Sequence, residues 1–212
     1  MLQTFSSFRS GYTPTVWCFP ATLNTCVYIK VQLNGELNYE RELLDLPDGG
    51  VLALDWANLG NKNRLIVLVL PGLTGCSQDN YVSHMVQKAE KLSCLAVVMN
   101  YRGNQVELRT PRTFCAVNYD DVHFVVSHIR KKYKDHKILA IGLSMGGLKL
   151  AGYLAKHNNP CLLSYAMVVS SPMNLSDATE ELEKVHNYMF FNYYLTRRIN
   201  MFFSKLVKKI FI

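Results

Sequence analysis

The sequence lacks any long apolar segment. No apolar run approaches the ~20 residues that a membrane-spanning helix needs. The longest run, Leu65–Leu70, is followed by Pro71 and is typical of a buried strand. The first residues, Met1 to Gly11, also lack the basic start and apolar stretch of a secretory signal peptide. We therefore expect an intracellular protein, cytoplasmic or membrane-associated, with no transmembrane segment in this chain, or a protein whose targeting segment is absent from this version of the sequence.

Paired cysteines are absent as well. None of the six cysteines forms a CxxC pair, so the sequence indicates neither a zinc site nor a redox motif. Cys94 and Cys161 lie in or beside apolar segments, where we expect them in the core. We expect all six to be reduced, structural thiols, and no metal to be bound.

Acidic residues are missing from the C-terminal end. Residues 196–212 contain five basic residues and no acidic one, whereas the whole chain has a net charge of +7. The rest of the chain therefore carries only +2. A charge excess confined to one end does not indicate a nucleic-acid-binding domain. The remaining composition, 49% apolar and 18% charged, is that of an ordinary globular protein with one domain.

Three regions follow one another along the chain. Residues 1–38 have few charges and many aromatics, including Tyr12–Trp17, and are interpreted as an N-terminal extension. Residues 39–175 are interpreted as the core of the domain. It begins with a hairpin in which 39–46 and 51–56 alternate around the turn Pro47-Asp48-Gly49-Gly50. Residues 176–212 are interpreted as a cap-like helical segment rich in aromatic and basic residues.

Apolar strands then alternate with amphipathic helices. We predict strands at 65–70, 94–99, 138–142 and 165–170, and helices at 80–91, 120–131 and 148–157. In the first helix we expect Tyr81, Met85 and Ala89 to share the buried face. This alternation predicts an α/β fold with a mostly parallel sheet and helices on both of its faces.

A serine occupies the turn between the third apolar strand and the following helix. Gly142-Leu143-Ser144-Met145-Gly146 matches GxSxG in a strand–turn–helix context, which predicts a nucleophile elbow with Ser144 as nucleophile. The turn is so tight that bulkier residues at Gly142 and Gly146 would clash. The helix N-terminus behind Ser144 favours developing negative charge. The alternative is a glycine-rich turn in which the serine only caps the helix.

A second glycine-rich turn, Pro71-Gly72-Leu73-Thr74-Gly75, directly follows the first buried strand. An α/β-hydrolase takes one oxyanion-hole N–H from this loop and the other from the residue after the nucleophile. The prediction names the backbone amides of Leu73 and Met145. Taken alone, the loop is equally well explained as a plain glycine turn.

These segments resemble one known family. The resemblance includes 70–75, Asn100-Tyr101-Arg102-Gly103, Thr110-Pro111-Arg112 and 142–147, and also 14–18, Asp48-Gly49-Gly50, Leu54-Asp55-Trp56 and 191–195. Together they resemble the AB hydrolase 4 family, with abhydrolase domain-containing proteins one and three as the nearest relatives. The resemblance implies the α/β-hydrolase fold and a serine carboxylic-ester hydrolase acting on lipids, as a phospholipase, acylglycerol lipase or short-chain esterase. It implies no cofactor. The motif alone leaves a thioesterase or a peptidase open.

The resemblance also implies a triad that this chain does not complete. In the family, the triad aspartate and histidine follow two further strands, beyond Ile212. We therefore expect a truncated form, an incomplete gene model or a fragment, in which 165–170 is a bare apolar edge. His157 is expected at the far end of the elbow helix, and His186 in the cap is a poor surrogate base. The other histidines, His84, His123, His128 and His136, are expected to be solvated, and Asp120, Asp121 and Asp177 to have no histidine to orient.

Two functions follow from these expectations. The first is ester hydrolysis of a lipid substrate by Ser144. The second is a catalytically inactive chain that acts at most as a lipid-binding or partner-binding module. Residues 196–212 are expected to contact anionic membrane surfaces, the alternative being an amphipathic helix that simply packs on the domain.

Overall fold

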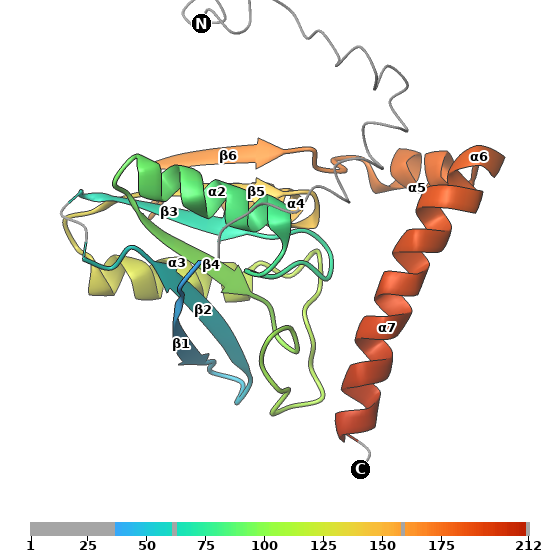
Figure 1. Ribbon diagram of the computed structural model, residues 1–212, viewed down its shortest axis with the longest axis horizontal. Helices are drawn as coiled ribbons and strands as arrows, with labels where there is room; N and C mark the ends of the chain where they lie inside the picture. Colours follow the sequence, from blue (N-terminus) through green and yellow to red (C-terminus); the bar gives the residue numbers. More distant parts are fainter. Residues whose placement is uncertain (1–36, 61–62, 158–159, 211–212) are drawn as a thin grey trace, which may run out of the picture. The chain divides into compact units, whose positions relative to one another are not determined.

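The computed structural model describes residues 37–60, 63–157 and 160–210 (Figure 1). Residues 35–212 form one compact unit, and the following description concerns that unit. The predicted N-terminal extension, with its Tyr12–Trp17 segment, falls almost wholly outside the described residues. The other predicted boundary, between 175 and 176, stays a prediction.

Six strands form one mostly parallel sheet, as predicted. The hairpin pairs β1 (Glu40–Asp45) with β2 (Val51–Ala57) in antiparallel register. The turn between them is closed by the N–H of Leu46, which donates to the carbonyl oxygen of Gly50 at 2.8 Å. The parallel strands are β3 (Leu65–Leu70), β4 (Leu95–Asn100), β5 (Lys137–Leu143) and β6 (Tyr165–Val169). The strand order is β1-β2-β4-β3-β5-β6, and β2 joins the parallel part by antiparallel pairing with β4.

Helices cover both faces because the parallel strands are apolar on both sides. In β3, Ile66, Leu68 and Leu70 face α3 (Asp120–Lys132) and α4 (Met145–Lys156), whereas Val67 and Val69 face α2 (Asn80–Lys91) (Figure 1). The bounds of α2 are those predicted, but of the three residues predicted to share one face only Ala89 is fully buried. Val82, Val86 and Ala89 are buried, and Tyr81 and Met85 flank them half-buried.

The larger of the two apolar clusters contains Trp56 on β2. Its indole is 2% exposed, its Nε1–H donates to Glu42 at 2.7 Å, and its ring lies 5.5 Å from that of Tyr133 at the end of α3. The ammonium of Lys132 sits 4.9 Å above the indole. Trp56 thus joins the hairpin to α3, and β4 and β3 separate its strand from β5 in the sheet.

The segment after β6 is helical, as predicted. It consists of α5 (Leu175–Glu183), α6 (Val185–Asn187), the π-helical turn η4 (Tyr188–Asn192) and α7 (Tyr193–Ile210). The Asn174 side chain caps α5 by accepting from the N–H groups of Ser176 and Asp177. Within the described ranges, no helix has the length and apolar character needed to cross a bilayer.

Strand β6 forms one edge of the sheet and is exposed along most of its length. Tyr165, Met167 and Val168 are each at least 40% accessible. The expectation of an apolar edge strand is therefore confirmed for the described part of the chain. Such an edge offers unpaired backbone groups to another strand.

Two expectations about side-chain environment are wrong. Cys94 is buried, but Cys161 is exposed, because the strand begins only at Tyr165. Of the four histidines expected in water, only His84 is exposed. The others are half-buried because each has a specific neighbour: His123 stacks on His157, His128 bonds to Glu42, and His136 packs on the Tyr133 ring.

Candidate active site

Ser144 lies in a strained turn between β5 and α4. Its φ of 52° and ψ of −118° belong to a region that residues with a Cβ atom rarely adopt. The helix begins at Met145, three residues earlier than predicted, so the turn consists of Ser144 alone. A Cβ atom at Gly142 would lie 2.5 Å from the carbonyl oxygen of Gly146, and one at Gly146 would collide with the carbonyl of Leu70. Only glycine therefore fits on either side of the serine.

Strain recurs at the ends of the two neighbouring parallel strands. Thr74 follows β3 with a φ of 58°, and Ser170 follows β6 with a φ of 48°. For a β-branched residue such as Thr74, a positive φ is a genuine outlier. The three strands β3, β5 and β6 are adjacent and parallel, so the strained residues that follow them lie at the same end of the sheet, beyond the carboxyl ends of the strands. Strained backbone of this kind clusters at functional sites.

The loop after β3 passes directly beside Ser144. A Cβ atom at Gly72 would lie 3.4 Å from the Cβ of Ser144. The Tyr101 hydroxyl donates to the carbonyl oxygen of Pro71 at 2.9 Å, and the Gly72 N–H donates to the Tyr81 hydroxyl at 3.0 Å. Both tyrosines are shielded from water, and burial raises the pKa of each hydroxyl. They remain neutral and hold the loop at its start.

The same loop is also held at its far end. The Asn104 amide donates to the carbonyl oxygen of Gly75 at 2.6 Å, and the Cys76 N–H donates to the Asp79 carboxylate at 2.9 Å. The N–H of Gly75 closes a turn onto the carbonyl of Gly72. Among the described residues, the Leu73 N–H in the middle of this loop donates to no backbone acceptor. The Met145 N–H is the first of α4 and has no acceptor within the helix. Of the two predicted oxyanion-hole donors, the Leu73 N–H thus belongs to a fixed loop and the Met145 N–H to a helix N-terminus.

A buried carboxylate, Asp55 on β2, anchors the end of this loop. Asp55 is fully buried and accepts hydrogen bonds from the hydroxyl of Ser77 at 2.5 Å, the amide of Asn100 at 2.8 Å and the guanidinium of Arg41 at 2.7 Å. Burial raises the pKa of the Asp55 carboxyl, but the hydrogen bonds outweigh it, so the pKa lies below its usual value. Asp55 is therefore ionised and fastens the loop to the sheet.

A buried lysine secures a second loop to the elbow helix. Lys149 on α4 is 1% exposed, and its Nζ donates to the carbonyl oxygens of Cys115 and Asn118, each at 2.7 Å. Burial lowers the pKa of Lys149 to about 8. At neutral pH, below this pKa, Lys149 is still mostly an ammonium, and the two carbonyls accept two of its three hydrogens. This contact fixes the segment that contains Ala116, which lines the pocket at Ser144.

Three of the segments that carried the family resemblance, 48–50, 100–103 and 110–112, meet in one ion-pair network. Arg102 is 3% exposed and bonds to Asp121 at the start of α3 and to Asp48 in the hairpin turn, both at 2.7 Å. Its partners raise its pKa above the usual value, the Asp121 hydrogen bonds most of all. Arg112 adds a further bond to Asp48 at 2.9 Å. Asp121 is thus fully engaged as a structural residue, as its lack of a histidine partner suggested.

Ser144 opens into a pocket of about 690 Å³. Its walls are mainly apolar and come from the loop after β3, the start of α4 and the C-terminal helices. The apolar lining residues are Leu73, Ala116, Met145, Leu148, Pro172, Leu175, Ala178, Leu182, Phe191 and Leu195. A pocket of this size and character is typical of a site for a small apolar ligand.

The described part of this pocket contains no histidine or aspartate. His157 caps the far end of α4, about 18 Å of helix away, where its ring stacks on that of His123 at 4.1 Å. Asp120 pairs with Lys156 at that same end, and Asp177 lies in the first turn of α5. The side chain of His186 lies outside what the structure describes. The predicted separation of His157 from Ser144 is thus observed.

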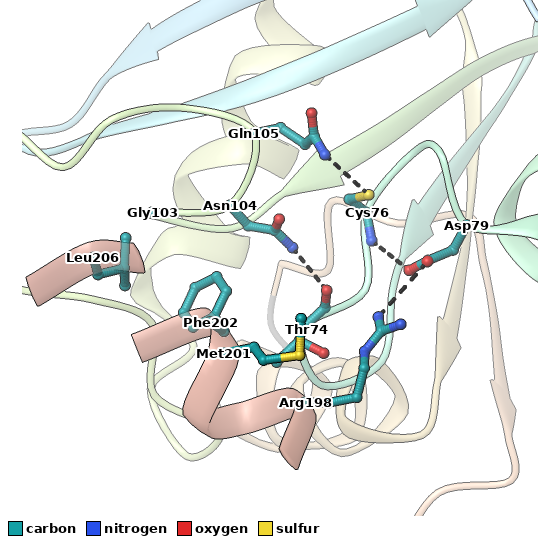
Figure 2. A pocket seen from close by; sticks show the side chains of 10 residues that line it. All are labelled: Thr74, Cys76, Asp79, Gly103, Asn104, Gln105, Arg198, Met201, Phe202 and Leu206. Carbon is teal, nitrogen blue, oxygen red and sulfur yellow. Dashed lines mark hydrogen bonds and ion pairs between the residues drawn. The ribbon is translucent and has the colours of Figure 1, made fainter. Parts of the chain in front are cut away.

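A second pocket of about 400 Å³ is lined by the same loop (Figure 2). Thr74 and Cys76 line it from the loop, and Phe202 and Leu206 from α7. Arg198 of α7 reaches Asp79 at 3.8 Å. The loop that passes Ser144 therefore lines both pockets, and α7 forms one wall of the second.

Sequence reasoning missed Asp55, Lys149 and Arg102 as residues that position the site. One signal was available: a charged residue inside an otherwise apolar strand or helix face is rarely buried without a partner. The partners themselves lie 14 to 54 residues away and cannot be identified from local pattern. No group of side chains suited to a metal ion occurs in the described ranges.

Known proteins share both the fold and much of the sequence. A family model described as alpha/beta hydrolase fold matches residues 66–202. The human protein named phospholipase ABHD3 is 38% identical over 87% of this chain and 47% of its own length. Escherichia coli putative esterase YheT is 31% identical over 72% of this chain and 46% of its own length. The chain thus spans about half the length of the curated relatives it matches.

Solved structures agree on the fold. An esterase from Pyrococcus furiosus superposes with a TM-score of 0.57 at 15% identity, covering 79% of this chain and 66% of that one. A lidless serine hydrolase from Xanthomonas campestris superposes with a TM-score of 0.52 at 16% identity, over 68% of this chain and 66% of that one. The resemblance to abhydrolase domain-containing proteins is thereby confirmed, and the chain belongs to the α/β-hydrolase fold family.

Proposed function

We propose that this chain provides the nucleophile, the oxyanion hole and the acyl pocket of a serine carboxylic-ester hydrolase that acts on lipid acyl esters. The observation that carries the proposal is Ser144, strained between β5 and α4 and opening into an apolar pocket beside the loop that contains Leu73. The names of relatives, phospholipase and esterase, support the same reaction class.

In this reaction the Ser144 hydroxyl attacks the ester carbonyl, and its proton passes to a general base. The carbonyl oxygen becomes an oxyanion that accepts hydrogen bonds from the N–H groups of Leu73 and Met145. Because the loop is fixed by Tyr81, Tyr101 and Asp55, these donors need no rearrangement when charge develops. The N-terminus of α4 adds a favourable dipole. The apolar pocket holds the acyl chain.

A second function is favoured by one observation: the described pocket walls carry no histidine or aspartate, and their one carboxylate, Glu181, is paired with Lys184. A serine hydroxyl without a base is a weak nucleophile. The 212-residue chain would then bind a lipid or a partner without turning over an ester.

Labelling with a fluorophosphonate separates the two. If Ser144 is an activated nucleophile, the purified chain is labelled and Ser144→Ala is not. Labelling that persists in Ser144→Ala would remove Ser144 from the reaction. Absence of labelling in the unsubstituted chain, together with saturable binding of a fluorescent fatty-acyl probe, would assign it the binding function.

A further inference from the structure

The C-terminal helices present large apolar side chains to solvent. Met189 and Tyr193 are 64% and 65% exposed, and Tyr188, Tyr194 and Met201 are exposed as well. All belong to the short stretch formed by η4 and α7. Single exposed apolar residues are ordinary, but a group of this density on one stretch indicates an interaction surface. We call these five residues the outer face, of which Met201 also lines the second pocket (Figure 2).

The charge of the same stretch has one sign. From Val185 to Ile212 the sequence contains five basic residues and no acidic one. Arg197 is exposed and follows Tyr193 by one helical turn. Basic side chains among exposed aromatics are typical of helices that lie in the interface of an anionic bilayer.

The inner side of the same helix is committed to the domain. The Phe202 ring packs on Phe114 at 5.5 Å, and Leu206 is buried close to Gly103 (Figure 2). Arg198 points toward Asp79 from this inner side. Because α7 is held by these contacts, its outer face is presented on a fixed support.

The outer face and the pocket at Ser144 share one wall. Asn187, Phe191 and Leu195 line the pocket at helical spacing, while Tyr188 and Tyr193, their neighbours along the chain, are exposed. A surface that binds the outer face would therefore lie directly behind the acyl pocket. A bilayer suits this position, because its lipids contain the acyl chains that the pocket is proposed to bind.

A second copy of this chain fits less well. Two outer faces in contact would bring Arg197 of each copy together with no acidic residue from the same segments to offset the charge. Like charges in an interface are unfavourable, whereas anionic lipid head groups complement them.

We propose that η4 and α7 dock the domain on an anionic membrane surface through the outer face, with Arg197 contacting lipid phosphate. This docking does not depend on the proposed hydrolysis, because it involves neither Ser144 nor the oxyanion hole.

Co-sedimentation with vesicles tests the proposal. The 212-residue chain should bind vesicles of phosphatidylcholine with 30% phosphatidylserine (about the composition that gives a strongly negative surface) better than pure phosphatidylcholine, and high salt should weaken binding. Arg197→Gln should lower the partition coefficient about fivefold, and Tyr193→Ser should lower it on both vesicle types. Ser144→Ala should bind like the unsubstituted chain, which separates docking from catalysis.

Matched controls use exposed residues outside the outer face. Lys88→Gln on α2 and Tyr165→Ser on β6 should leave vesicle binding unchanged. Equal loss in control and test variants, or binding that ignores anionic lipid, would overturn the proposal. So would absence of vesicle binding combined with self-association that Tyr193→Ser abolishes, because that result would assign the outer face to a second copy.

Discussion

Replacing Ser144 with glycine should stabilise the fold while removing the nucleophile. The backbone at Ser144 has φ 52° and ψ −118°, where a Cβ atom is strained and glycine is not. Strain of this kind costs about 1–3 kcal/mol. Glycine also loses more chain entropy on folding, which offsets about 0.4–1 kcal/mol of the gain. With central values of both effects, Ser144→Gly should be about 1 kcal/mol more stable than Ser144→Ala.

Ser144→Ala is the matched control because it keeps the Cβ atom and the strain. The Ser144 hydroxyl makes no capping hydrogen bond to α4, so its removal should cost little stability. For a chain of this length, about 1 kcal/mol corresponds to roughly 2–4 °C in Tm. Thermal unfolding followed by circular dichroism would measure the difference, and both variants should resist fluorophosphonate labelling. A glycine variant that unfolds at or below the Tm of the alanine variant would refute the argument from backbone strain.

Three further predictions concern the surroundings of Ser144. Gly146→Ala should lower the free energy of unfolding, measured by urea denaturation, by about 1–3 kcal/mol, or prevent folding, because its Cβ meets the Leu70 carbonyl. Gly60→Ala is the control, because its Cβ has open space and the change should be near neutral. Similar effects of the two substitutions would contradict the packing argument. The folded-state pKa of Asp55 is depressed, so its contribution is present above pH ~4 and lost as pH falls through the folded pKa. Asp55→Asn should therefore be less stable than the unsubstituted chain at pH 7 and should lose less stability on acidification. Parallel profiles of stability against pH for the two chains would contradict this assignment to Asp55. For Lys149 the folded pKa of about 8 lies below the unfolded value, so stability should rise between pH 8 and 10, by at most about 1.4 kcal/mol per pH unit. Lys149→Met should lack that rise in urea midpoints, and a rise that persists would assign it to another group.

The sequence predicts the central strands closely because each is a short continuous apolar run. Residues 65–70 form β3 with the predicted bounds, since a buried parallel strand is apolar on both faces. Helix α4 begins earlier than predicted because Gly146 and Gly147 in its first turn weaken the local signal, while tertiary packing against the ends of β3 and β6 requires them. The buried face of α2 was placed one residue off, because Tyr81 and Val82 are both apolar and only the sheet decides between them.

The position of Ser144 also follows from the sequence, since strand, glycine, serine and glycine are contiguous. The supports of the site do not follow in this way. Asp55 reaches Ser77 and Asn100 across 22 and 45 residues, and such contacts exist only after the strands have paired. The exposure of Cys161 has the same origin, because whether a short apolar segment is covered depends on what packs over it.

The buried indole of Trp56 makes the chain its own fluorescent reporter. The sequence has two tryptophans, so Trp17→Phe would leave Trp56 as the single emitter. Trp56 lies on β2, separated from β5 by β4 and β3. Its emission should shift to longer wavelength only when the hairpin and α3 come apart and water reaches the ring. A change confined to α7 or to the loop beside Ser144 would be silent at this wavelength, so movement at the site and loss of the whole fold can be measured as separate events in one sample.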